Sequence, residues 1–204
     1  MFEALVTAVL TNGIQLLTGV QARWVGCVPA ATPRVYFANH ASHVDFVLLW
    51  SVLPVRLRRS TRPVAAIDYW DRGALRRYFA KRVFHSVLVS RDHVQRQQDP
   101  VALMCQAIDR GSSLIVFPEG TRGPGTEMQP FKSGLFHLAK ARPDVELVPV
   151  WIDNSYRVMP KGMVLPVPLL CSVAFGKPLR LECREQKSEF LDRLRRSLVE
   201  LGSA

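Results

Sequence analysis

Residues 99–117 read DPVALMCQAIDRGSSLIVF and contain the signals of a helix followed by those of a strand. Asp99 is a preferred N-cap residue, Pro100 suits the first helical position, and Gly111 follows the last turn. The apolar run at 113–117 is rich in β-branched residues and predicts a buried strand. A helix and a strand joined by a short turn are typical of an α/β fold.

The same alternation continues along most of the chain. Further apolar runs predict strands, at 34–38, 63–67, 86–90, 146–152 and 169–175. Helical patterns fill most of the intervals, at 43–53, 71–83, 131–141 and 188–201. This order predicts an α/β fold with a mostly parallel central sheet flanked by helices. The 204 residues suit one domain with a short appendage, which we divide into an N-terminal helix over 1–25 and a main domain over 26–204.

An uncharged run of nineteen residues extends from Ala4 to Ala22. Polar residues recur within it at helical spacing, at Thr7, Thr11, Gln15 and Thr18. The pattern favours an amphipathic helix lying in a membrane interface with an uncharged polar side. An ordinary core helix is the alternative. A membrane span or a signal peptide fits less well, because polar residues interrupt the run and no basic residue precedes it.

The charge is strongly basic, with 27 Lys and Arg against 17 Asp and Glu and a net charge of +10. Nine basic and two acidic residues fall between Arg56 and Arg82, so much of the excess is local. A basic face attracts anionic lipid headgroups, phosphorylated substrates or nucleic acid. No nucleic-acid-binding module is recognisable, so we expect no specific nucleic-acid partner. A predicted basic helix at 71–84 suits an anionic lipid surface, or else is a solvated face.

Polar residues follow several predicted strands directly, at Asn39, His40, Ser42, Asp45, Arg91, Glu119, Arg122 and Asp153. In open α/β sheets, ligands bind beyond the carboxyl ends of the strands. Residues from separate loops therefore converge on one edge of the predicted sheet. This convergence predicts a functional site there.

His40 and Asp45 have the spacing of a general base and its partner. If Ser42 caps the next helix, Asp45 is its N3 residue and its carboxylate can fold back toward His40. The Nδ1–H group of His40 would then donate to Asp45 and leave Nε2 free to accept a proton. A capping box formed by Ser42 and Asp45 is the structural alternative, and the two uses are compatible.

Other chemistry at this segment has less support. A metal site using His40, His43 and Asp45 needs further ligands that the spacing does not supply. The four cysteines form no CxxC pair, so no metal site is predicted. Ser42 lacks the G-x-S-x-G context of a hydrolase nucleophile.

The segment PEGTRG at 118–123 combines glycines with an arginine, which suits binding of an anion such as phosphate. No Gly-Lys-Ser/Thr sequence follows, so this is not a Walker loop. Arg91 is a candidate second phosphate contact, with a surface ion pair as the alternative.

Taken in order, these segments resemble the motifs of the glycerolipid acyltransferases. NHASHVD at 39–45 matches the NHxSxxD form of the HX4D motif, and FPEGTR at 117–122 matches a second motif. FKSG at 131–134 matches FKxG, and VPV at 148–150 matches a late Val-Pro-Val block. The resemblance covers about 35–150. The turn that follows FPEGTR departs from the charged or polar turn common in the family.

The resemblance implies an enzyme that moves a fatty acyl group from a thioester, acyl-CoA or acyl-carrier protein, to a lysolipid or glycerol phosphate hydroxyl. His40 would be the general base, and Asp45 would orient it and stabilise the imidazolium. The acceptor hydroxyl would attack the thioester directly, with no acyl-enzyme and no cofactor. Substrate binding would fall to Arg91, Glu119, Gly120, Thr121 and Arg122. Supporting roles would fall to Asn39, Ser42, Lys132 and Pro149.

The resulting expectation is a 1-acylglycerol-3-phosphate O-acyltransferase that makes phosphatidate. We expect it at the cytoplasmic face of a membrane, peripheral or monotopic, with the lipid surface, a lysophospholipid and an acyl thioester as partners. The first alternative is the same chemistry on another acceptor, such as glycerol 3-phosphate or another lysolipid. The second is a protein that binds anionic lipid without turnover.

Overall fold

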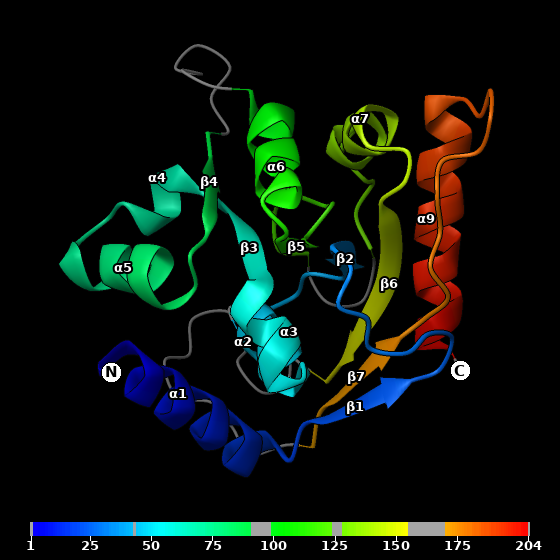
Figure 1. The fold of residues 1–204 in the computed structure, drawn as a ribbon. Coiled ribbons are helices and arrows are strands. Elements are labelled where there is room, and N and C mark those ends of the chain that lie inside the picture. Colours follow the sequence, from blue (N-terminus) through cyan, green and yellow to red (C-terminus); the bar gives the residue numbers. More distant parts are fainter. Residues whose placement is uncertain (1, 43, 91–98, 124–127, 155–169, 204) are drawn as a thin grey trace.

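The computed structural model describes residues 2–42, 44–90, 99–123, 128–154 and 170–203 (Figure 1). The strands are β1 (Gln21–Trp24), β2 (Arg34–Ala38), β3 (Thr61–Ala66), β4 (Val87–Val89), β5 (Ser113–Val116), β6 (Glu146–Asp153) and β7 (Ser172–Phe175). The helices are α1 (Phe2–Thr18), α2 (Asp45–Val52), α3 (Val55–Ser60), α4 (Ile67–Trp70), α5 (Ala74–Tyr78), a π-helical turn η1 (Phe79–Val83), α6 (Pro100–Asp109), α7 (Gly134–Ala141) and α9 (Lys187–Gly202).

The described strands form one sheet in the order β1-β7-β6-β2-β5-β3-β4. β6 and β7 pair antiparallel, and the other described pairs are parallel. β2 lies in the middle, between β6 and β5, and each of its residues is buried. The predicted α/β fold with a mostly parallel sheet is therefore confirmed.

Helices cover both faces of this sheet (Figure 1). On one face, α6, α7 and α9 pack in a cluster that includes Val35 and Phe37 of β2. On the other face, α1 and α2 pack in a cluster that includes Tyr36 and Ala38. Successive residues of a strand point to opposite faces, so β2 contributes alternately to the two cores.

The residues predicted to begin and end α6 occupy those positions. The side chain of Asp99 accepts a hydrogen bond from the backbone N–H of Val101 at 3.2 Å, and Pro100 begins the helix. Gly111 follows the helix with φ of 82°, in the region that glycine adopts without strain. Its turn leads into β5, which is the strand predicted in this part of the chain.

Three details differ from the sequence expectation. The predicted helix through Ala22 ends at Thr18, Gly19 turns the chain with φ of 53°, and β1 pairs with β7. The predicted helix at 71–83 is shorter, because α5 starts after Gly73 and continues as the π-helical turn η1. The short helices α3 and α4 were not expected. The division into 1–25 and 26–204 stays a prediction.

Helix α1 turns its polar side toward the protein. Thr11 and Thr18 are buried, and each hydroxyl donates to a backbone carbonyl four residues earlier in the helix. The opposite side is apolar and exposed, with Phe2, Leu5, Val9 and Leu16 at 69%, 62%, 65% and 88% exposure. Within the described ranges, no helix is both long enough and apolar enough to cross a membrane.

Candidate functional site

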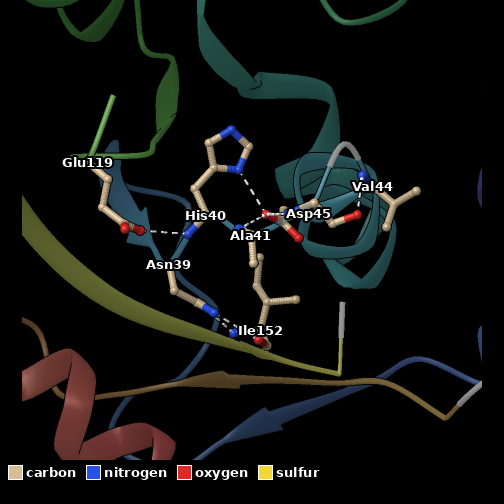
Figure 2. A network of polar contacts seen from close by, with 8 residues as sticks. Asn39, His40, Ala41, Val44, Asp45, Glu119 and Ile152 are labelled. Atoms are coloured by element: carbon tan, nitrogen blue, oxygen red, sulfur yellow. Dashed lines mark hydrogen bonds and ion pairs between the residues drawn. The ribbon is translucent and has the colours of Figure 1, made fainter. Parts of the chain in front are cut away.

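His40 and Asp45 are in contact at the carboxyl end of β2. The Nδ1 atom of His40 lies 2.8 Å from Oδ2 of Asp45 (Figure 2). A carboxylate only accepts hydrogen bonds, so Nδ1 carries the hydrogen, and in the neutral ring Nε2 keeps its lone pair. The His40 side chain is 21% exposed and the Asp45 side chain is fully buried. The geometry therefore leaves a proton-accepting nitrogen on a ring that solvent or substrate can reach.

Asp45 also holds the loop that precedes α2. Its Oδ2 atom accepts from the backbone N–H groups of Ala41 at 2.7 Å and Ser42 at 2.8 Å. The carboxylate thus folds back ahead of the helix, as the spacing predicted. The helix itself begins at Asp45 with Val44 at the N-cap, so Ser42 does not cap it in the expected way. The buried Ser42 hydroxyl accepts from the N–H of Val44 at 3.4 Å.

Asn39 ties the same loop to the neighbouring strand β6. Its side-chain amide donates to the carbonyl of Ile152 at 2.9 Å, and its Oδ1 atom accepts from the N–H of Ile152 at 2.8 Å (Figure 2). The side-chain amide of Asn39 therefore forms the two hydrogen bonds to Ile152 that a backbone residue would form if β2 continued. This link fixes the start of the segment that carries His40.

Glu119, which follows β5, approaches the site from its other side. Its Oε1 atom accepts from the backbone N–H of His40 at 2.8 Å (Figure 2). Its Oε2 atom accepts from the backbone N–H of Gln129 at 2.8 Å. The residue is only 4% exposed. Burial raises the pKa of the Glu119 carboxyl above its usual value, even though the two donated hydrogen bonds favour the charged form. The carboxyl thus connects the His40 loop to the segment after PEGTR.

Gly120 sits in a tight turn at this point. Its φ is 71°, and a Cβ atom there would lie 2.8 Å from Nζ of Lys132, so the Lys132 side chain passes directly over the glycine. Thr121 and Arg122 follow the turn and are exposed. The backbone N–H of Gly123 donates to the carbonyl of His40 at 2.9 Å, which joins the turn to the His40 loop.

Pro149 is not brought to this cluster by any contact of the described residues. Pro149 is buried within β6, beside Phe37 of β2, and its carbonyl accepts from the N–H of Gly176 at 2.9 Å. Arg91 lies outside the described residues, as does His43. Among the described residues, no three His, Cys, Asp or Glu side chains gather closely enough to hold a metal ion.

Phe117 is a site residue that our sequence reasoning named only as part of a motif. Its ring stacks on the imidazole of His40, with centroids 4.2 Å apart and planes 21° from parallel. Its position as the last residue of the predicted strand at 113–117, directly before PEGTRG, was the signal available. The sequence did not show that β2 and β5 are neighbours, and their pairing brings Phe117 next to His40.

Comparisons with known proteins point to one family. A family model described as Acyltransferase matches residues 25–153. The 1-acyl-sn-glycerol-3-phosphate acyltransferase of Saccharomyces cerevisiae is 28% identical over 201 residues, which cover 92% of this chain and 61% of the yeast protein. The human 1-acyl-sn-glycerol-3-phosphate acyltransferase alpha is 31% identical over 144 residues, which cover 68% of this chain and 46% of the human protein.

A chloroplastic 1-acyl-sn-glycerol-3-phosphate acyltransferase of Brassica napus is 29% identical over 131 residues, covering 64% of this chain and 36% of the plant protein. The chain thus spans between 36% and 61% of the length of these relatives. Among solved structures, the 1-acyl-sn-glycerophosphate acyltransferase PlsC from Thermotoga maritima matches with a TM-score of 0.75 at 18% identity, covering 98% of this chain and 80% of that one. The two proteins share a fold.

Proposed function

The chain belongs to the acyltransferase family, and on that premise we propose that it transfers a fatty acyl group from acyl-CoA or acyl-carrier protein to the hydroxyl of lysophosphatidate. The product is phosphatidate. The observation that carries this proposal is the 2.8 Å contact between His40 and the buried carboxylate of Asp45. The names of the yeast, human and plant relatives support lysophosphatidate as the acceptor.

His40 acts as the general base in this reaction. Its Nε2 atom takes the proton of the acceptor hydroxyl while the hydroxyl oxygen attacks the thioester carbonyl carbon. The imidazolium that forms is stabilised by the carboxylate of Asp45. The tetrahedral intermediate then collapses, the carbon–sulfur bond breaks, and His40 returns its proton to the leaving thiolate. The products are an ester and a free thiol, so atoms and charge balance.

Glu119 and Asn39 act as positioning residues in this proposal. Both oxygens of Glu119 already accept backbone hydrogen bonds, which favours a role in holding the His40 loop over direct contact with the acceptor. Arg122 and Lys132 are the cations adjacent to the Gly120 turn, and we assign them to the phosphate of the acceptor. Arg91 keeps its predicted phosphate role. Pro149 and Ser42 keep their predicted supporting roles.

We place the protein on a lipid surface, with the exposed apolar side of α1 in the interface. This side carries Phe2, Leu5, Val9 and Leu16, whose solvent exposure has a free-energy cost that lipid contact removes. The π-helical turn η1, which carries Lys81 and Arg82, lies beside α1, and Arg82 approaches Glu3 at 4.0 Å. Basic residues near an anionic membrane add about 1 kcal/mol each to binding. The cytoplasmic face remains the predicted side.

The catalytic proposal is tested with purified protein and vesicles that contain lysophosphatidate, with acyl-CoA or acyl-carrier protein as donor. His40→Ala should lower turnover by about 10²–10⁴-fold, because the general base is lost. His137→Ala is the matched control, since His137 is an exposed histidine of α7 and its loss should leave turnover unchanged. Full turnover by a folded His40→Ala variant would refute the assignment.

The acceptor is tested with a panel of hydroxyl compounds in the same assay. Lysophosphatidate should have the highest kcat/KM, ahead of glycerol 3-phosphate and of lysolipids with other headgroups. A higher value for another acceptor would replace lysophosphatidate but keep the chemistry. Binding of anionic vesicles without turnover of any acceptor would instead favour the non-catalytic alternative.

The lipid-surface proposal is tested by co-sedimentation with anionic vesicles. The double variant Leu5→Gln/Val9→Gln should bind about tenfold more weakly for each apolar side chain lost. Val199→Gln is the matched control, because Val199 is an exposed apolar residue of α9 at 42% exposure. Equal binding by the double variant and the control would place the lipid contact elsewhere.

A further inference from the structure

Phe117 and Asp45 hold the imidazole of His40 in different ways. Asp45 contacts one edge of the ring, at Nδ1, with a distance of 2.8 Å. Phe117 covers a face of the ring, with centroids 4.2 Å apart and planes 21° from parallel. A hydrogen bond to one edge leaves the ring free to tilt about that bond, and a stacked neighbour prevents the tilt. Together the two contacts define both the direction of Nε2 and the plane in which it lies.

Phe117 is itself held in place. It follows β5 directly and is half-buried against the cluster that also contains Tyr36 and Ile115. Its carbonyl accepts from the N–H of Gly120 at 3.0 Å, which closes the turn. The ring is therefore anchored by the core on one side and presents its face to His40 on the other.

We propose that Phe117 is a positioning residue of the acyl-transfer site, which aims Nε2 of His40 at the acceptor hydroxyl and stabilises the imidazolium formed when His40 takes the proton. The face of an aromatic ring carries partial negative charge, and a cation within about 6 Å of the centroid is attracted to it. Neutral imidazole lacks this attraction, so the stabilisation appears as the proton is transferred. Such a contact raises kcat and leaves KM unchanged. This inference rests on the proposed function of His40.

The test replaces the ring while keeping an apolar side chain. Phe117→Leu should lower kcat roughly tenfold, with little change in the KM of either substrate. Phe117→Tyr keeps an aromatic face and should restore most of the activity. Phe136→Leu is the matched control, because Phe136 is a half-buried phenylalanine of α7 that contacts His137 at an edge, with planes 73° apart. The control should retain wild-type kcat.

A second readout reports on the ring contact without turnover. In wild-type protein, the ring current of Phe117 should shift the His40 imidazole proton resonances upfield in NMR spectra. Phe117→Leu should abolish this shift, and Phe117→Tyr should keep it. If Phe117→Leu fails to fold, Phe117→Met takes its place, since an unbranched apolar chain adapts to an irregular space.

The outcomes separate the two proposals. Wild-type kcat in folded Phe117→Leu or Phe117→Met, in a protein that otherwise turns over, overturns the role of Phe117 and leaves the proposed function intact. An upfield shift in a wild-type protein that acylates no acceptor overturns the proposed function, and with it the catalytic use of the stack. A lowered kcat with a raised KM and no rescue by tyrosine indicates a merely structural residue and also overturns the inference.

Discussion

Replacing Asp45 by asparagine tests the charge of this side chain separately from its shape. The Oδ2 atom accepts three hydrogen bonds, from Nδ1 of His40 at 2.8 Å and from the backbone N–H groups of Ala41 at 2.7 Å and Ser42 at 2.8 Å. An asparagine oxygen can accept the same three bonds. The variant therefore keeps the loop geometry and removes the negative charge beside His40.

The expected effects on stability and catalysis differ in size. Hydrogen bonds to a charged acceptor contribute about 1 kcal/mol more than bonds to a neutral one. The new amide donors would face the buried Oδ1 position, where the described residues offer no partner. Easier burial of a neutral group offsets part of this loss. We expect unfolding free energy to fall by about 2 kcal/mol, which lowers Tm by about 4–8 °C.

Catalysis should suffer more. At an effective dielectric constant of about 20, two unit charges about 4 Å apart attract by about 4 kcal/mol. Asp45→Asn loses this attraction when the imidazolium forms, which corresponds to a loss of about 10³-fold in kcat. The assay is steady-state acylation of lysophosphatidate, with thermal unfolding measured on the same samples.

Asp109→Asn is the matched control, because Asp109 pairs with Arg142 on the surface and should not affect turnover. The double variant His40→Ala/Asp45→Asn should be no slower than His40→Ala alone, since the two residues act as one unit. A folded Asp45→Asn protein with kcat within threefold of wild type would refute the reasoning.

The other predictions concern the residues that hold the His40 loop. Asn39→Ala leaves the N–H and carbonyl of Ile152 without their partners, so we expect unfolding free energy to fall by about 2 kcal/mol and kcat to fall with it; an unchanged Tm would contradict this. Burial raises the folded-state pKa of Glu119 above 4.5, so the stability linked to this group is full below pH 4.5 and is lost as the pH rises through the folded-state value. Glu119→Gln does not titrate and should flatten that part of the curve of unfolding free energy against pH, measured by urea unfolding; an equal slope in both proteins would argue against it.

Local signals in the sequence were sufficient for much of the architecture. The helix after Asp99 and the strand at 113–117 follow from capping residues, proline geometry and β-branched composition, which act within a few residues of each other. The positions of His40 and Asp45 follow in the same way. The predicted contact is present at 2.8 Å, but Asp45 is the first residue of α2 and not its third, because Val44 and not Ser42 is the N-cap.

Other features depend on contacts between distant parts of the chain. β1 has only four residues, of which Gln21 and Arg23 are exposed, and it became recognisable as a strand only through its pairing with β7. The link from Asn39 to Ile152 spans 113 residues, and the bond from Glu119 to His40 spans 79. The order of strands in the sheet decides these contacts, and periodicity carries no information about strand order.

Helix α1 illustrates the division between the two sources of information. Its periodicity alone established that the helix has a threonine-rich side and an apolar side. Only the tertiary structure decided that the threonine-rich side faces the protein. The physical reason is that the hydroxyls of Thr11 and Thr18 bond to backbone carbonyls of their own helix, so they can be buried without unpaired polar groups, and the apolar side is left exposed.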